Sequence, residues 1–172
     1  MAYQQKMASE SRDLQLSAVM DDDFVEAQKQ WQGGNKCILE AMRAMKYHDY
    51  ETCNHAMILL KRLETAPGLK IGDVLWHASD SRAAPDTYVP LATSVSLEGA
   101  EAYAVNNIQE DKRVYHKLVV AELGVKALAI GADDYYRREQ EMLLMMDAKL
   151  TQTGSEHVDG KLVVTHDVIP DN

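Results

Sequence analysis

The sequence predicts a mainly α-helical protein, a helical bundle built from two helix hairpins with a long irregular connection and a C-terminal β-hairpin or extended tail. Apolar residues recur at helical spacing over 38–63 and 114–150, whereas proline and glycine interrupt 66–95. With 46% hydrophobic residues, the 172-residue chain can bury a core. We expect an acidic N-terminal arm at 1–33, a helical domain at 34–152 that includes the irregular excursion, and a β tail at 153–172.

The first half of the chain indicates a helix in the arm and a helix hairpin after it. Asp21 and its two acidic neighbours are suited to cap a short helix over 24–31, and Gly33-Gly34 ends it. One helix then follows Asn35, and another follows Asp49 with Cys53, Ala56, Met57, Leu60 and Leu63 on one face. Only three residues separate them, which predicts a tight antiparallel hairpin.

The second half predicts a helix from Ser96 and then a second hairpin, 111–130 packed against 134–150. In its first helix, apolar residues repeat at intervals of four and three: Val114, Leu118, Ala121, Val125 and Leu128. Gly131 separates the two helices. We expect this pair to carry the core, so that an aspartate at Leu118 or Val125 unfolds the domain.

The tail indicates a β-hairpin, with Asp159-Gly160 as its turn between apolar segments. An isolated two-stranded hairpin is marginal in water, so it needs a third strand. Because the rest of the chain is predicted to be helix and loop, we expect that strand to come from another chain. The candidate inter-subunit contacts are Val158, Leu162, Val163, Val164, Val168 and Trp76.

Charge and cysteine content exclude several classes of protein. The formal net charge is −9, and the acid excess lies in the ends and the central connection, whereas 111–150 holds seven basic and seven acidic residues. This balance argues against a nucleic-acid binder. Two cysteines indicate a reducing compartment rather than a disulfide framework. No signal peptide or membrane-spanning run is found, so we expect a cytoplasmic protein.

No motif supports a metal site, a cofactor or catalysis. Cys37, His48, Cys53 and His55 invite a zinc interpretation, but their spacing fails, and we expect both cysteines in the core. None of the six histidines follows a glutamate by three residues, as a di-iron bundle requires. There is no nucleophile elbow, phosphate loop or dinucleotide fingerprint. The acids Glu122, Glu139 and Glu141 are interpreted as solvated helix faces.

The predicted order of elements resembles the head–tail adaptor (connector) proteins of tailed bacteriophages. The resemblance rests on a hairpin at 38–63, an excursion at 66–95, an apolar helix at 114–130, the Gly/Asp loop at 131–134, and a helix opening with Tyr135-Tyr136-Arg137-Arg138. It implies a non-enzymatic structural subunit of a homo-oligomeric ring, docked under a portal and against tail proteins. DNA would pass through without specific binding. The protein would occupy the host cytoplasm during assembly and then the virion.

Two other functions remain open at this point. Six methionines, most of them on the predicted stripes, suit either core packing or a groove that binds a partner helix: Met42, Met45, Met57, Met142, Met145 and Met146. The chain could therefore be a small helical interaction module, such as a chaperone or regulator. The acidic balance would also suit an inhibitor that mimics DNA, although the predicted helices are nearly neutral.

Overall fold

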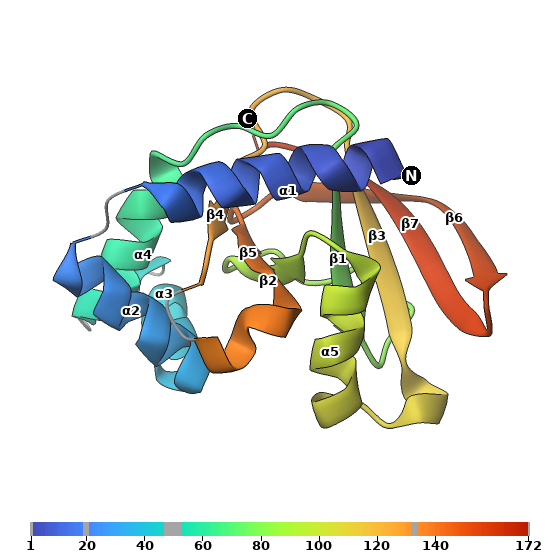
Figure 1. Ribbon diagram of the computed structural model, residues 1–172, viewed down its shortest axis with the longest axis horizontal. Helices are drawn as coiled ribbons and strands as arrows, with labels where there is room; N and C mark the ends of the chain where they lie inside the picture. Colours follow the sequence, from blue (N-terminus) through green and yellow to red (C-terminus); the bar gives the residue numbers. More distant parts are fainter. Residues whose placement is uncertain (1, 19–20, 47–52, 132–133, 172) are drawn as a thin grey trace.

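The computed structural model describes residues 2–18, 21–46, 53–131 and 134–171 (Figure 1). The fold is mixed α/β, with helices at the N-terminus and one seven-stranded sheet. The α-helices are α1 Ala2–Ser17, α2 Asp22–Gly33, α3 Lys36–Lys46, α4 Asn54–Glu64 and α5 Leu97–Asn107. The strands are β1 Val74–Ser79, β2 Leu91–Ser94, β3 Val114–Val120, β4 Ala127–Ala129, β5 Glu141–Leu144, β6 Lys149–Val158 and β7 Lys161–Ile169, with short 3₁₀ helices η1 Glu110–Lys112 and η2 Asp134–Glu139.

The sheet has the strand order β4-β5-β2-β1-β3-β7-β6. Its neighbouring strands are antiparallel except for β3 and β7, which run parallel. Helix α1 packs on one face, where Ala8 joins a core with Leu75, Leu118 and Met142. The other face is covered by α2–α4 over one half, and by α5 over β1 (Figure 1).

The predicted all-helical bundle is wrong, because the second hairpin is part of the sheet. Residues predicted as a helix over 111–130 form η1, β3 and β4, and those over 134–150 form η2, β5 and the start of β6. In β3 the alternate residues Val114, His116, Leu118 and Val120 are all buried. Strand alternation and a helical stripe share Val114 and Leu118, and burial on both faces of a central strand hides the period of two.

The helices predicted in the first half of the chain, and the predicted start of α5, are confirmed where the structure describes them. Asp21 caps α2, with its Oδ1 atom accepting from the Phe24 amide at 2.8 Å. Helices α3 and α4 are present, although the predicted turn at 47–49 and the Asp49 cap lie outside the described residues. Ser96 caps α5 by accepting from the Gly99 amide at 3.0 Å. Among the described residues, no helix is both long and apolar enough to span a membrane.

The C-terminal hairpin is confirmed, but the third strand predicted from another chain is not. Strands β6 and β7 pair antiparallel around Asp159 and Gly160, whose φ angles of 50° and 78° are left-handed. The third strand is the chain's own β3, which pairs with β7 from Val114–Leu162 to Val120–Val168. Because 114–120 is a strand and not the predicted helix, the hairpin finds its third strand within the chain.

Candidate functional site

A pocket opens where β1 and β2 separate. Among the described residues, these strands pair only at Trp76 opposite Ser94, and Ser94 in turn lies opposite Glu141 of β5. Trp76, Ser94 and Glu141 therefore stand in a row on one face of the sheet. The pocket beside them has a volume of about 340 Å³, within the range of small-molecule sites. The end of α2, α5 and η2 supply its other walls.

Helix α5 approaches the row closely because Gly99 has no side chain. A Cβ atom at this position would collide with Ser94 Oγ and would lie 2.5 Å from the Glu139 carbonyl oxygen. Ser96, which caps α5, also donates from its hydroxyl to Gln140 Oε1 at 2.5 Å. The first turn of α5 is thus fixed against residues 139–141.

Glu139 and Glu141 both line the pocket from the junction of η2 and β5. Gln140 between them has a φ of 47°, a left-handed conformation that a non-glycine residue seldom adopts. Its carbonyl oxygen accepts from the Val95 amide at 3.3 Å, and its amide donates to the Arg137 carbonyl at 3.2 Å. Backbone strain of this kind concentrates at functional sites.

Glu141 is poised to change its charge near neutral pH. Burial, with a smaller contribution from Glu139, raises the pKa of its carboxyl to about 7, although a hydrogen bond from Trp31 and the charge of Arg12 oppose the shift. That bond runs from Trp31 Nε1 to Glu141 Oε2 at 2.7 Å and joins α2 to the site. Burial also raises the pKa of Glu139. Both carboxyl groups of the pocket therefore lie in environments that favour their neutral forms.

His77 bridges the gap between β1 and β2. Its Nδ1 atom lies 2.7 Å from the Ala92 carbonyl oxygen, which can only accept, so Nδ1 carries the proton. Burial lowers the pKa of His77, although the bond to Ala92 opposes this. The imidazole is therefore neutral at pH 7, and Nε2 is free of a proton.

His77 also begins a row of three imidazoles that leads away from the pocket. Its ring centroid is 6.1 Å from that of His116 on β3, which is 5.1 Å from that of His166 on β7. His116 Nε2 lies 2.9 Å from the Ser81 carbonyl, so it is protonated, and His116 Nδ1 accepts from His166 Nε2 at 2.9 Å. All three imidazoles are accordingly neutral in the folded protein.

The lining of the pocket is aromatic and acidic. Trp31, Trp76, Tyr103 and Tyr136 contribute rings, and among the described lining residues no lysine or arginine is present. Aromatic faces and carboxylates both attract a planar cation. The arrangement can therefore bind a cationic ring or a guanidinium group and stabilise positive charge that develops near Glu141.

The residues predicted as inter-subunit contacts lie mostly within the chain's own core. Trp76, Val163, Val164 and Val168 are buried, Leu162 is half-buried, and Val158 at the hairpin end is exposed. Only Trp76 reaches the pocket.

The prediction that both cysteines lie in the core is wrong for Cys37, which is exposed. Cys53 is half-buried and packs against the core cluster of α2–α4. His48 lies outside the described residues. Within the described part of the chain, no group of three or more His, Cys, Asp or Glu side chains is placed to hold a metal ion.

The sequence prediction missed His77, Ser94, Glu139 and Glu141. It placed the two glutamates on a solvated helix face, but Glu141 begins a strand and points into the pocket. The usable signal was the apolar run at 142–146 directly after two acids, since such a run suits a buried strand.

The fold has close counterparts among solved structures. Plx2a, an ADP-ribosyltransferase toxin from Paenibacillus larvae, superposes with a TM-score of 0.62 at 14% identity, covering 98% of this chain and 96% of Plx2a. C3stau2 from S. aureus, solved with NAD, gives 0.61 at 12% identity over 95% of each chain. The ADP-ribosyltransferase Vis from Vibrio splendidus, solved with agmatine, gives 0.60 at 12% identity over 98% of this chain and 86% of Vis.

The sequence itself matches no protein-family model and no curated protein. The match in fold overturns the resemblance to phage head–tail adaptors and, with it, the non-enzymatic ring subunit and its portal and tail partners. That resemblance depended on a helix at 114–130 that is a strand, and on a helical bundle that is a sheet. The chain has the fold of the bacterial ADP-ribosyltransferase toxins.

Proposed function

We propose that this protein is an ADP-ribosyltransferase that uses NAD as its donor substrate and works at the pocket of His77, Ser94, Glu139 and Glu141. The observation that carries the proposal is the pair of glutamates, two residues apart, in an aromatic pocket whose described lining lacks lysine and arginine. The likeness to C3stau2, which was solved with NAD, supports the choice of donor.

The lining suits the end of NAD that reacts. The nicotinamide ring of NAD is planar and positively charged, and tryptophan and tyrosine faces attract such a cation. A cation beside Glu141 would also lower the pKa of its carboxyl, which is about 7 mainly because of burial. Donor binding would therefore convert Glu141 to its carboxylate form.

Transfer of ADP-ribose requires a group that stabilises positive charge and a group that accepts a proton, and the two glutamates can serve in these roles. NAD supplies an ADP-ribosyl group whose bond to nicotinamide breaks with both electrons passing to the ring nitrogen, while the acceptor atom bonds to the ribose carbon and loses a proton. Positive charge develops on the ribose, as it does in glycoside cleavage, and the Glu141 carboxylate stabilises it. Glu139 is placed to take the proton from the acceptor.

A guanidinium group is the acceptor that the site favours. Carboxylates bind guanidinium groups strongly, and the likeness to Vis, which was solved with agmatine, supports this class. Tyr135 is 83% exposed and packs edge-on against Tyr136, a lining residue, with ring centroids 4.9 Å apart. An exposed aromatic ring beside the pocket suits an acceptor carried on a protein.

The test measures nicotinamide release from NAD, with and without agmatine, and the mass of any agmatine adduct. We expect release by the wild-type protein, and a decrease of about 10²–10³-fold for Glu141→Gln. Glu156→Gln, which changes an exposed carboxylate on β6, serves as the matched control and should keep full activity. If wild type and Glu141→Gln both bind NAD but neither releases nicotinamide from it, the proposed transferase activity is refuted.

A further inference from the structure

A second hollow lies away from the proposed catalytic pocket and shares no lining residue with it. This groove has a volume of about 1190 Å³ and runs between α4, the first turn of α2, the 123–126 turn and the β5–β6 connection. Its floor is apolar and includes three methionines, Met57, Met145 and Met146, beside Ile58 and Leu60. We propose that the groove binds a basic amphipathic helix of a partner protein.

The apolar part of the groove is open to solvent. Met57 is 47% exposed and Leu123 is 73% exposed, and both line the same groove. Exposed apolar side chains that gather in one place are typical of interaction sites. Methionine is flexible and polarizable, so a methionine floor adapts to the side chains of an inserted helix. Amphipathic helices bind grooves of this kind through apolar side chains spaced three and four residues apart.

The charge around the groove selects a basic partner. Five acidic residues line it, Asp23, Glu26, Glu64, Asp147 and Asp171, against only two lysines among the described lining residues. One of these, Lys126, donates from Nζ to the Glu64 carbonyl oxygen at 2.6 Å. The lining therefore has an excess of acidic over basic residues, and lysines or arginines flanking the apolar stripe of a helix would complement it.

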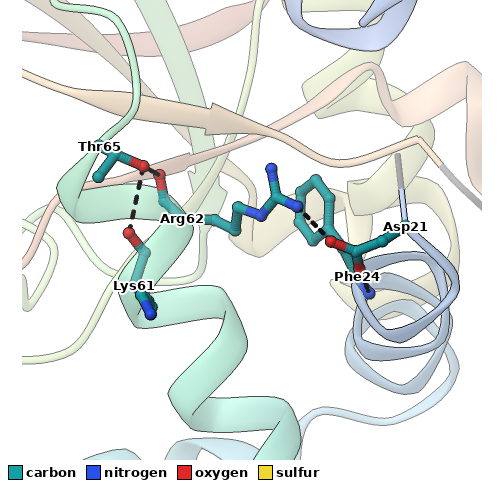
Figure 2. A network of polar contacts seen from close by, with 5 residues as sticks. All are labelled: Asp21, Phe24, Lys61, Arg62 and Thr65. Carbon is teal, nitrogen blue, oxygen red and sulfur yellow. Dashed lines mark hydrogen bonds and ion pairs between the residues drawn. The ribbon is translucent and has the colours of Figure 1, made fainter. Parts of the chain in front are cut away.

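The two walls of the groove are held together before any partner binds. Figure 2 shows Arg62 of α4 reaching Asp21, which caps α2, and stacking on Phe24. The Arg62 Nη2 to Asp21 Oδ2 distance is 2.6 Å, and the guanidinium lies 4.6 Å from the centre of the Phe24 ring. A preformed groove loses less entropy on binding.

The probe is a fluorescein-labelled helical peptide of about 15 leucines and lysines, with a matched leucine–glutamate peptide for comparison. Anisotropy is measured at low and high salt with wild type, Met57→Gln and Glu26→Lys. The matched controls are Val105→Gln, which alters an exposed apolar residue on α5, and Glu156→Lys on β6. None of these positions lines the catalytic pocket, so NAD turnover should be unchanged throughout.

We expect the basic peptide to bind wild type in a salt-dependent way. Met57→Gln and Glu26→Lys should each weaken binding about tenfold, and the two controls less than twofold. Equal binding by groove and control variants, or equal binding of the acidic peptide, would overturn the proposal. A wild-type dimer in light scattering that Met57→Gln dissociates would also overturn it, because the groove would then hold a second copy.

Discussion

Burial acts on both the pocket carboxyls and the histidine row, but its consequence differs between the two regions. Burial raises the pKa of Glu141 and lowers that of His116, so both groups are pushed toward the neutral form. Glu141 opens into a pocket, where a cation can restore its charge, whereas His116 is fully buried between two other imidazoles. At the open pocket, burial leaves a neutral carboxyl that a bound cation can ionise. In the closed core, burial of the imidazole only limits the pH range over which the fold is stable.

The two regions should also change stability with opposite sign as pH changes. A folded pKa above the unfolded one makes Glu141 lose stability as pH rises from 4.5 to about 7. A folded pKa below the unfolded one makes His116 lose stability as pH falls from 6.5 to about 4. Between pH 4.5 and pH 6.5 the two contributions nearly cancel, so we expect these groups to lower stability only above and below that range.

The largest expected effect comes from placing a charge in the closed region. Leu118 of β3 is 0% exposed in the core beneath α1, so Leu118→Asp buries a carboxylate without a partner. The cost is several kcal/mol, comparable to a typical total stability of about 5–15 kcal/mol. Circular dichroism should show an unfolded chain, whereas Leu123→Asp, at an exposed leucine, should melt like wild type. Similar melting of both variants would mean that the core is not where β3 places it.

The next effect concerns the histidine row itself. Replacing both His116 and His166 with leucine removes both hydrogen-bond partners together, which leaves no orphaned group between them. Wild type should lose on the order of 3 kcal/mol from this row between pH 6.5 and pH 4, because His116 titrates at about 4 when folded. Besides burial and the Ser81 carbonyl, the groups that shift the pKa of His116 are His77 and His166, and no carboxylate is among them.

Urea unfolding of the double variant at several pH values tests this. Measured as the difference from wild type at each pH, the stability of the double variant should rise by on the order of 3 kcal/mol from pH 6.5 to pH 4, whereas His157→Leu, at an exposed position on β6, should show no such change. An unchanged slope in the double variant would assign the acid sensitivity to other groups.

The two regions also differ in what their sequences disclose. The caps of α2 and α5 and the Asp159-Gly160 hairpin were predictable because each depends on neighbours in the sequence. The sheet was not predictable, because Tyr115 and Val119 on the second face of β3 are apolar like Val114 and Leu118 on the first, and β5 has only four residues. Neither strand therefore shows an alternation of apolar and polar residues. The site depends on pairing between β2 and β5, residues 47 apart in sequence, as in Ser94 opposite Glu141. A pattern within one segment cannot indicate that two strands so far apart in the sequence will pair.

A smaller effect should appear on the alkaline side. Because burial raises the pKa of Glu141 to about 7, its ionised form destabilises the fold at pH 8. Glu141→Gln should therefore be more stable than wild type at pH 8, on the order of 2 kcal/mol after screening by the open pocket, and nearly equal at pH 4. Thermal melts at both pH values test this, with Glu156→Gln, which changes an exposed carboxylate on β6, as the control. A variant less stable at pH 8 would show that the Glu141 carboxylate is paired rather than desolvated.

The smallest expected effect isolates the hydrogen bond from Trp31. Its indole donates to Glu141 Oε2 at 2.7 Å and so opposes the rise in the carboxyl pKa. Trp31→Phe keeps an aromatic ring but removes the donor, and the pKa of Glu141 should rise by about half a unit. Trp76→Phe is the matched control, because the Trp76 indole nitrogen is buried without a hydrogen-bond partner among the described residues. Carbon-13 NMR titration of the Glu141 carboxyl carbon reads the pKa directly and needs no enzymatic activity. A shift in Trp76→Phe equal to that in Trp31→Phe would mean that aromatic packing, and not the donated proton, tunes this carboxyl.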